Sequence, residues 1–126
     1  MKTNTFILMI TVYSLLLGLP AIFAPVMSSE YFGKPDPNIN ELSLFNFIGG
    51  YQVVMGYLGY VAYRSTDKIA RRGWLLSIAC LCIFAILVYV YNLNIRQMLA
   101  HKTLAIDVTI WAIIALGSIY FWNQEK

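Results

Sequence analysis

One ionisable side chain interrupts an otherwise uncharged run near the end of the chain. Asp107 is the only charged residue within residues 103–124. Thr103 is a candidate N-cap for a helix over this run, which places Asp107 about one turn in, at the positive end of the helix dipole. Ionisable residues inside apolar spans are candidates for functional sites. Two interpretations are open: a structural ion pair with Arg96 or Lys102, or a site that carries a proton or binds a ligand.

A second candidate site is a stripe of small and polar residues within residues 42–63. At about 100° per residue, one face of a helix collects Gly49, Gln52, Gly56, Gly59 and Tyr60. Small residues let helix backbones approach closely, so we expect this face to pack against another helix, with Gln52 hydrogen-bonded across the contact. In the alternative interpretation the face lines the site of a lipophilic ligand, with Gln52 and Tyr60 as its polar groups.

Other chemistry-bearing residues predict no catalytic or metal site. His101 is the only histidine, which excludes a two-histidine haem site, and we expect it to be a solvated loop residue. Cys80 and Cys82 point about 200° apart on a helix, so they cannot pair with each other and are expected to be small buried hydrophobes. The sequence has no phosphate-binding glycine loop and no nucleophile elbow.

The composition distinguishes a membrane protein from a soluble one. Of 126 residues, 60% are hydrophobic and 12% are charged, with a mean hydropathy of +0.66. A soluble domain carries about 25% charged residues. The balance therefore excludes a soluble globular domain, a disordered chain, a disulfide scaffold and a nucleic-acid binder.

Uncharged runs predict four membrane-spanning helices. They cover residues 6–24, 42–63, 73–95 and 103–124, and each is long enough for a helix to cross a bilayer, which takes roughly 20 residues. We expect the first run to be a retained helix rather than a cleaved signal peptide. The predicted fold is all-α: one four-span transmembrane helix bundle over residues 1–126, with no extramembrane domain.

Basic residues predict the orientation of this bundle. The connection between the second and third runs holds Arg64, Lys68, Arg71 and Arg72, and basic loops stay on the cytoplasmic side. We therefore expect both termini in the cytoplasm. Attraction to anionic lipid headgroups also accounts for Arg71 and Arg72.

Prolines and capping residues predict the helix ends. Pro20 is expected to kink or end the first helix, and Pro25 to stop it. Asn40 or Ser43 is expected to cap the second span.

Several short motifs resemble the DoxX-like superfamily of small four-helix bacterial membrane proteins. The first half of the chain has Phe23-Ala24-Pro25, then Gly33, then the pair Gly49-Gly50 followed by Gly56. DoxX-like proteins often carry an arginine just before the glycine pair, where this chain has Asn46-Phe47-Ile48. The resemblance implies a four-helix bundle in a bacterial inner membrane and an association with quinone-linked or other redox complexes.

These patterns lead to two expected functions. The first is a non-enzymatic accessory or scaffold subunit, bound through its glycine face to itself or to other membrane subunits. The alternative is a quinone- or lipid-binding protein that supports a membrane redox complex. A small transporter that works as an oligomer is a third interpretation. The expected surroundings are the lipid bilayer, with no nucleic acid.

Overall fold

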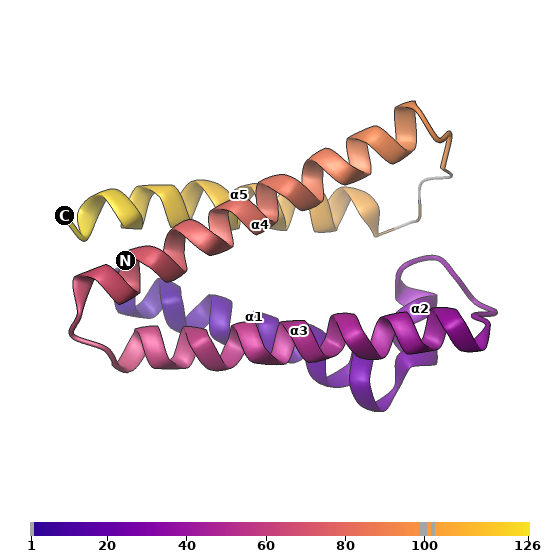
Figure 1. Ribbon diagram of the computed structural model, residues 1–126. Helices are drawn as coiled ribbons and strands as arrows, with labels where there is room; N and C mark the ends of the chain where they lie inside the picture. Colours follow the sequence, from indigo (N-terminus) through magenta and orange to yellow (C-terminus); the bar gives the residue numbers. More distant parts are fainter. Residues whose placement is uncertain (1, 99–100, 102) are drawn as a thin grey trace. The chain divides into compact units, whose positions relative to one another are not determined.

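The chain is all-helical, with helices joined by short connections, in the part that the computed structural model describes, residues 2–98, 101 and 103–126. The helices are α1 (Thr3–Phe23), α2 (Pro25–Tyr31), α3 (Ile39–Arg64), α4 (Lys68–Asn94) and α5 (Leu104–Gln124). They form two compact units, Met1–Arg64 and Ser65–Lys126. In the first unit α1 packs along α3 and α2 contacts both, and in the second α4 packs along α5 (Figure 1). The all-α prediction is confirmed, while a single domain over the whole chain stays a prediction.

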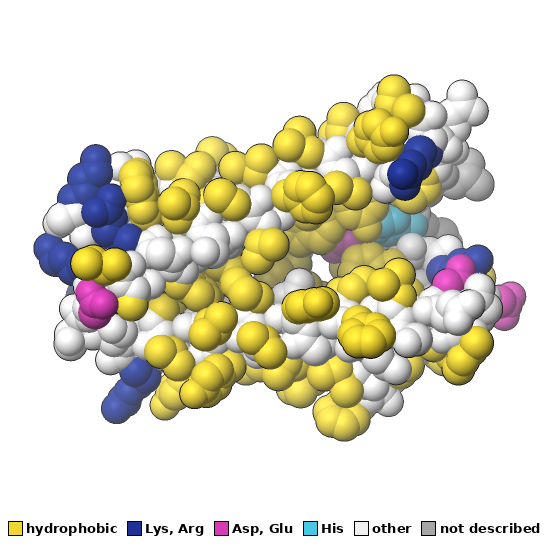
Figure 2. All heavy atoms as spheres, in the orientation of Figure 1, with side chains coloured by type: hydrophobic (Ala, Val, Ile, Leu, Met, Phe, Trp, Pro, Cys, Tyr) yellow, Lys and Arg dark blue, Asp and Glu magenta, His cyan; other side chains and the backbone are white. Residues whose placement is uncertain are grey.

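Three helices of the described chain, α1, α4 and α5, are long and apolar enough to cross a membrane. Each exposes large apolar side chains, such as Leu16 at 66%, Phe84 at 66% and Leu116 at 70%, and Figure 2 shows apolar side chains over much of the visible surface. Apolar exposure of this extent fits contact with lipid. α3 has 26 residues but is less apolar, because glycines, tyrosines and polar residues replace aliphatic ones. The structure therefore fits a small integral membrane protein, and the span at 42–63 stays a prediction.

Glycines bring α1 and α3 into close backbone contact. A Cβ atom added to Gly49 would lie 2.8 Å from the carbonyl oxygen of Gly18 and 2.9 Å from Cβ of Ala21. A Cβ atom on Gly18 would in turn lie 2.9 Å from the carbonyl oxygen of Gly49. Two glycines on facing helices thus leave no room for a side chain, as small residues do in membrane helix pairs.

The first helix runs past one proline and ends before the next. Pro20 lies inside α1, which ends at Phe23, and Ala24 leaves the helical region with φ −138° and ψ 60°. Pro25, which was expected to stop the first helix, also begins α2. Proline suits the first turn of a helix, because the N–H that it lacks would have no partner there.

Asn46 of α3 compensates for the hydrogen bond that Pro25 cannot make. In a continuous helix the N–H of residue 25 would bond the carbonyl of Ala21, but proline has no N–H. With its amide oriented to match its surroundings, the side-chain nitrogen of Asn46 donates to the carbonyl oxygens of Ala21 at 3.0 Å and Ile22 at 3.2 Å. A side chain of α3 therefore caps the carboxyl end of α1.

Replacing Asn46 with aspartate is expected to destabilise the protein by about 1–3 kcal/mol, because an isosteric acceptor then faces two carbonyl oxygens. The matched control is Asn40→Asp, since a carboxylate in the first turn of α3 meets the positive end of the helix dipole and should be neutral or stabilising. Unfolding in mild detergent, followed by circular dichroism, measures both variants. Equal stability of the two would contradict the capping role of Asn46.

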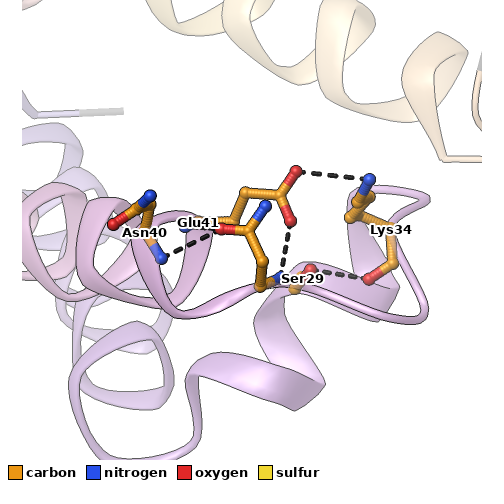
Figure 3. A network of polar contacts seen from close by, with 5 residues as sticks. Ser29, Lys34, Asn40 and Glu41 are labelled. Carbon is orange, nitrogen blue, oxygen red and sulfur yellow. Dashed lines mark hydrogen bonds and ion pairs between the residues drawn. The ribbon is translucent and has the colours of Figure 1, made fainter.

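The segment between α2 and α3 begins with a Schellman motif. Gly33 has φ 83°, the left-handed conformation that glycine adopts without strain. The N–H of Gly33 donates to the carbonyl of Glu30 at 3.0 Å, and the N–H of Lys34 donates to that of Ser29 at 2.9 Å. The buried Ser29 hydroxyl also donates to the Lys34 carbonyl at 2.6 Å (Figure 3). The two backbone bonds satisfy carbonyl groups at the end of α2, and the Ser29 hydroxyl ties the following segment back to the helix.

α3 begins with a capping box. The side-chain oxygen of Asn38 accepts from the N–H groups of Asn40 at 2.9 Å and Glu41 at 3.1 Å. The Glu41 carboxylate accepts from the Asn38 N–H at 2.7 Å, and its other oxygen pairs with Lys34 at 3.2 Å (Figure 3). The prediction that Asn40 or Ser43 caps this helix was wrong, because the helix begins one residue before Asn40 and the reciprocal bond needs a glutamate three residues after the cap.

The Asn38 N–H, followed by Lys34, holds the pKa of Glu41 below its ordinary value of 4.5. A carboxyl group with a lowered pKa stabilises the fold above its unfolded pKa, and this contribution disappears as the pH falls through the folded value. The Glu41 carboxyl resonance in an NMR titration is therefore expected to have a midpoint below 4.5. In an Asn38→Pro variant, which removes the N–H, the midpoint should move upward, and an unchanged midpoint would contradict the assignment.

Candidate functional site

A buried histidine–aspartate pair lies near the start of α5. Nε2 of His101 is 3.5 Å from Oδ2 of Asp107, and their side chains are only 7% and 4% exposed. The backbone N–H of Asp107 donates to the carbonyl of Thr103 at 3.0 Å, which fixes the aspartate in the first turn of the helix. The exposed N–H groups of that turn give a carboxylate a favourable electrostatic environment. The pair is the only one of its kind, since the chain has one histidine.

Two aromatic rings extend the pair into a larger cluster. The Tyr89 ring of α4 lies 5.7 Å from the His101 ring and 5.5 Å from the Trp111 ring, measured between centroids. Trp111 follows Asp107 by four residues, so it lies one turn further along the same face of α5. We call these residues the His–Asp cluster: Tyr89, His101, Asp107 and Trp111. The cluster presents a carboxylate and an imidazole beside two aromatic faces.

A buried amide adds an unsatisfied acceptor on the α4 side. Asn92 lies one turn after Tyr89, and within the described part of the chain its side-chain oxygen is buried without a hydrogen-bond donor. Buried polar atoms are normally paired, so this oxygen marks a position where a hydrogen-bond donor is expected. The cluster and Asn92 therefore offer hydrogen-bond acceptors, a donor and ring faces at one end of the α4–α5 pair.

The structure changes two sequence predictions about this region. His101 was expected to be solvated, which is wrong, because its side chain is buried against Asp107 and Tyr89. Arg96 was expected to pair with Asp107, but its guanidinium lies 5.4 Å from the centroid of the Tyr91 ring. The alternative partner, Lys102, falls outside the described residues.

Helical periodicity could not have identified the histidine as a partner of Asp107. His101 precedes α5, and the turn before it contains Gln97 with φ 52°. Residues in such a segment have no fixed angular relation to a helix. The only sequence signal for this pair was closeness along the chain, because His101 lies six residues before Asp107, which falls in the first turn of an apolar helix.

The glycine stripe of α3 contacts α1 of the same unit. Gly49 lies against Gly18, and a Cβ atom on Gly56 would lie 2.9 Å from Cδ2 of Leu15. Gly59 is also buried. The other two residues of the predicted site differ from the glycines: Gln52 is half-buried and Tyr60 is 49% exposed, with its ring 6.4 Å from that of Tyr63. Since α1 occupies the glycine positions, any partner has to use other surfaces.

The two cysteines lie on α4, outside the His–Asp cluster. Cys80 is exposed and Cys82 half-buried, so the prediction that Cys80 is buried was wrong. Both are free thiols. The described residues contain no group of three or more histidine, cysteine, aspartate or glutamate side chains that could hold a metal ion.

Comparisons of the chain with models of protein families, with curated proteins and with solved structures gave no match. The resemblance to DoxX-like proteins therefore stays a prediction.

Proposed function

We propose that the protein binds a lipophilic ligand with a polar ring, of the quinone class, at the His–Asp cluster and thereby supports a membrane redox complex. The observation that carries the proposal is the burial of the His101–Asp107 pair beside Tyr89 and Trp111. Isolated charges are costly within a membrane, so ionisable residues that persist there mark functional sites. The proposal follows the alternative function expected from the sequence.

The cluster has the chemistry that a quinone ring requires. A carbonyl oxygen of the quinone accepts a hydrogen bond from an imidazole or phenol donor, which His101 and Tyr89 supply. The flat ring stacks on an aromatic side chain such as Trp111, an arrangement that contributes about 0.5–1.5 kcal/mol beyond the buried area. A lipid headgroup accepts the same hydrogen bonds, but it has no flat ring that stacks on Trp111.

Native mass spectrometry of the purified protein tests this function, with decyl-ubiquinone as the probe. We expect one quinone per protomer and its loss in Trp111→Leu, while Tyr60→Leu, a change of an exposed tyrosine outside the cluster, retains it. Retention of phospholipid but not of the quinone would favour a lipid ligand. Equal quinone retention by Trp111→Leu and Tyr60→Leu would overturn the site.

The proposed setting is a bacterial inner membrane that the chain crosses four times, with both termini in the cytoplasm. The basic residues at the end of α3 (Arg64) and the start of α4 (Lys68, Arg71 and Arg72) support this orientation, because the cytoplasmic ends of spans carry an excess of lysine and arginine. α3 would form the remaining span, since its 26 residues reach about 39 Å at 1.5 Å per residue.

Cysteine labelling tests this topology, in a chain whose Cys80 and Cys82 are replaced by alanine. A cysteine at Thr66, which is exposed between α3 and α4, should react with an impermeant maleimide only from the cytoplasmic side. A cysteine at the exposed Asp36, between α2 and α3, should react only from the other side. Labelling of both positions from the same side would contradict four crossings.

A non-enzymatic accessory or scaffold role, in a DoxX-like protein that binds itself or other membrane subunits, is the second candidate. Exposed aromatic residues on α3 favour it, since Tyr51 is 73% and Tyr57 is 64% exposed and tyrosine is enriched in interfaces. Affinity purification in mild detergent distinguishes the roles: a subunit lost by a Tyr51→Ala/Tyr57→Ala variant supports the scaffold, and an unchanged monomer opposes it.

A further inference from the structure

The end of the α4–α5 pair remote from the His–Asp cluster carries a compact group of basic side chains. α4 begins with Lys68 and continues through Arg71 and Arg72, and α5 ends close to Trp122 and Lys126. Figure 2 shows lysine and arginine side chains gathered where α4 begins (dark blue). All five residues belong to the second unit, Ser65–Lys126.

Two of these cations share one aromatic ring. The guanidinium carbon of Arg72 lies 4.7 Å from the centroid of the Trp122 ring, and Nζ of Lys126 lies 5.8 Å from it. Both distances are within the range of cation–π attraction. Trp122 therefore holds two positive charges in one place, where they would otherwise repel each other.

Internal acidic partners satisfy only part of this group. Arg71 pairs with Glu125 at 2.9 Å, and Lys68 donates to a main-chain oxygen of Lys126 at 2.9 Å. Among the described residues, no carboxylate forms an ion pair with Arg72 or Lys126. Nε of Arg72 is moreover buried with no acceptor in the described part of the chain. An arginine N–H without an acceptor is costly, and phosphate is an acceptor that matches the arginine fork.

We infer that Arg72 and Lys126 bind the phosphate of an anionic phospholipid, with Trp122 between them at the membrane surface. The occupant is a lipid rather than free phosphate because the basic group borders two helices that suit a membrane interior. Tryptophan is also the side chain that settles at the headgroup level. Over the whole group the basic side chains of Lys68, Arg71, Arg72 and Lys126 outnumber the acidic side chains of Asp67 and Glu125, so the local field attracts an anion. This site is separate from the proposed quinone site.

The test counts the phospholipids that stay with the purified protein in neutral detergent, by native mass spectrometry after incubation with phosphatidylglycerol or phosphatidylcholine. We expect selective retention of phosphatidylglycerol. Each basic residue near a membrane surface contributes about 1 kcal/mol to the attraction, so Arg72→Gln or Lys126→Gln should weaken binding about fivefold and the double variant about thirtyfold.

The control is Arg96→Gln, which removes an equal charge that also lies over an aromatic ring, at the other end of α4. Its phosphatidylglycerol binding should stay at the level of the unaltered protein, and circular dichroism should show that all variants keep their helices. An equal loss in Arg96→Gln would show nonspecific attraction and overturn the site. Displacement of the lipid by inorganic phosphate at constant ionic strength would overturn the choice of a lipid.

Discussion

Replacing Gly49 with alanine is expected to destabilise the protein by about 1–3 kcal/mol, although it adds a single methyl group. That methyl carbon would lie 2.8 Å from the Gly18 carbonyl oxygen and 2.9 Å from Cβ of Ala21. Both neighbours belong to α1, and neither is the free end of a flexible side chain. The substitution therefore has to separate α1 from α3, which disturbs the contact along both helices.

The next residue is the matched control. A Cβ atom on Gly50 would meet nothing within 4 Å. Because alanine is the better helix former, Gly50→Ala should be neutral or stabilise the protein by about 0.5–1 kcal/mol. Gly56→Ala should lie between the two, since its nearest neighbour is the terminal methyl of Leu15, which can move.

Unfolding in mild detergent ranks these three variants directly. The expected order of stability is Gly50→Ala above Gly56→Ala above Gly49→Ala. If Gly49→Ala and Gly50→Ala were equally stable, the close packing of α1 on α3 would be wrong. If a Gly49 variant stays fully folded but loses its association with other subunits, the glycine face binds a partner.

The second large effect is expected at the His–Asp cluster. The double variant His101→Phe/Asp107→Leu should lose less stability than the sum of the losses in the two single variants. Phenylalanine keeps a ring beside Tyr89 but leaves the buried Asp107 carboxylate without the imidazole. Leucine likewise leaves the imidazole without the carboxylate. Removing one partner of a buried polar pair costs about 1–3 kcal/mol or more, whereas replacing both with apolar groups can be nearly neutral.

A double-mutant cycle measures this coupling free energy. For residues in direct contact we expect about 0.5–3 kcal/mol, obtained from unfolding of the two single variants and the double variant. A matched cycle of His101→Phe with Thr109→Val should give almost no coupling, because the exposed Thr109 hydroxyl donates to the Ala105 carbonyl of its own helix. Additive effects of His101→Phe and Asp107→Leu would remove the basis of the proposed site.

The same double variant links stability to function. If it unfolds like the unaltered protein but no longer retains decyl-ubiquinone, the polar pair serves the ligand rather than the fold. If it retains the quinone fully, the aromatic rings alone hold the ligand and the polar pair is structural.

The amino-acid sequence by itself determined that the chain is helical and that helices such as α4 and α5 are apolar enough to cross a membrane, because length and apolarity suffice to recognise them. It also predicted that the stripe containing Gly49 and Gly56 would face another helix, since glycine positions repeat with the helical period. Periodicity does not say which helix that is. The tertiary structure places α1 there, through the contact of Gly18 with Gly49.

Contacts that leave a regular helix were beyond the sequence. The burial of His101 depends on the path of the chain between α4 and α5, and the capping role of Asn46 depends on α3 lying beside the end of α1. Helical periodicity predicts neither contact, because His101 lies outside α5 and because periodicity does not say that α3 packs beside the end of α1. Only the tertiary structure decided these contacts, since a hydrogen bond between separate segments requires a specific distance and angle that depend on how the segments pack.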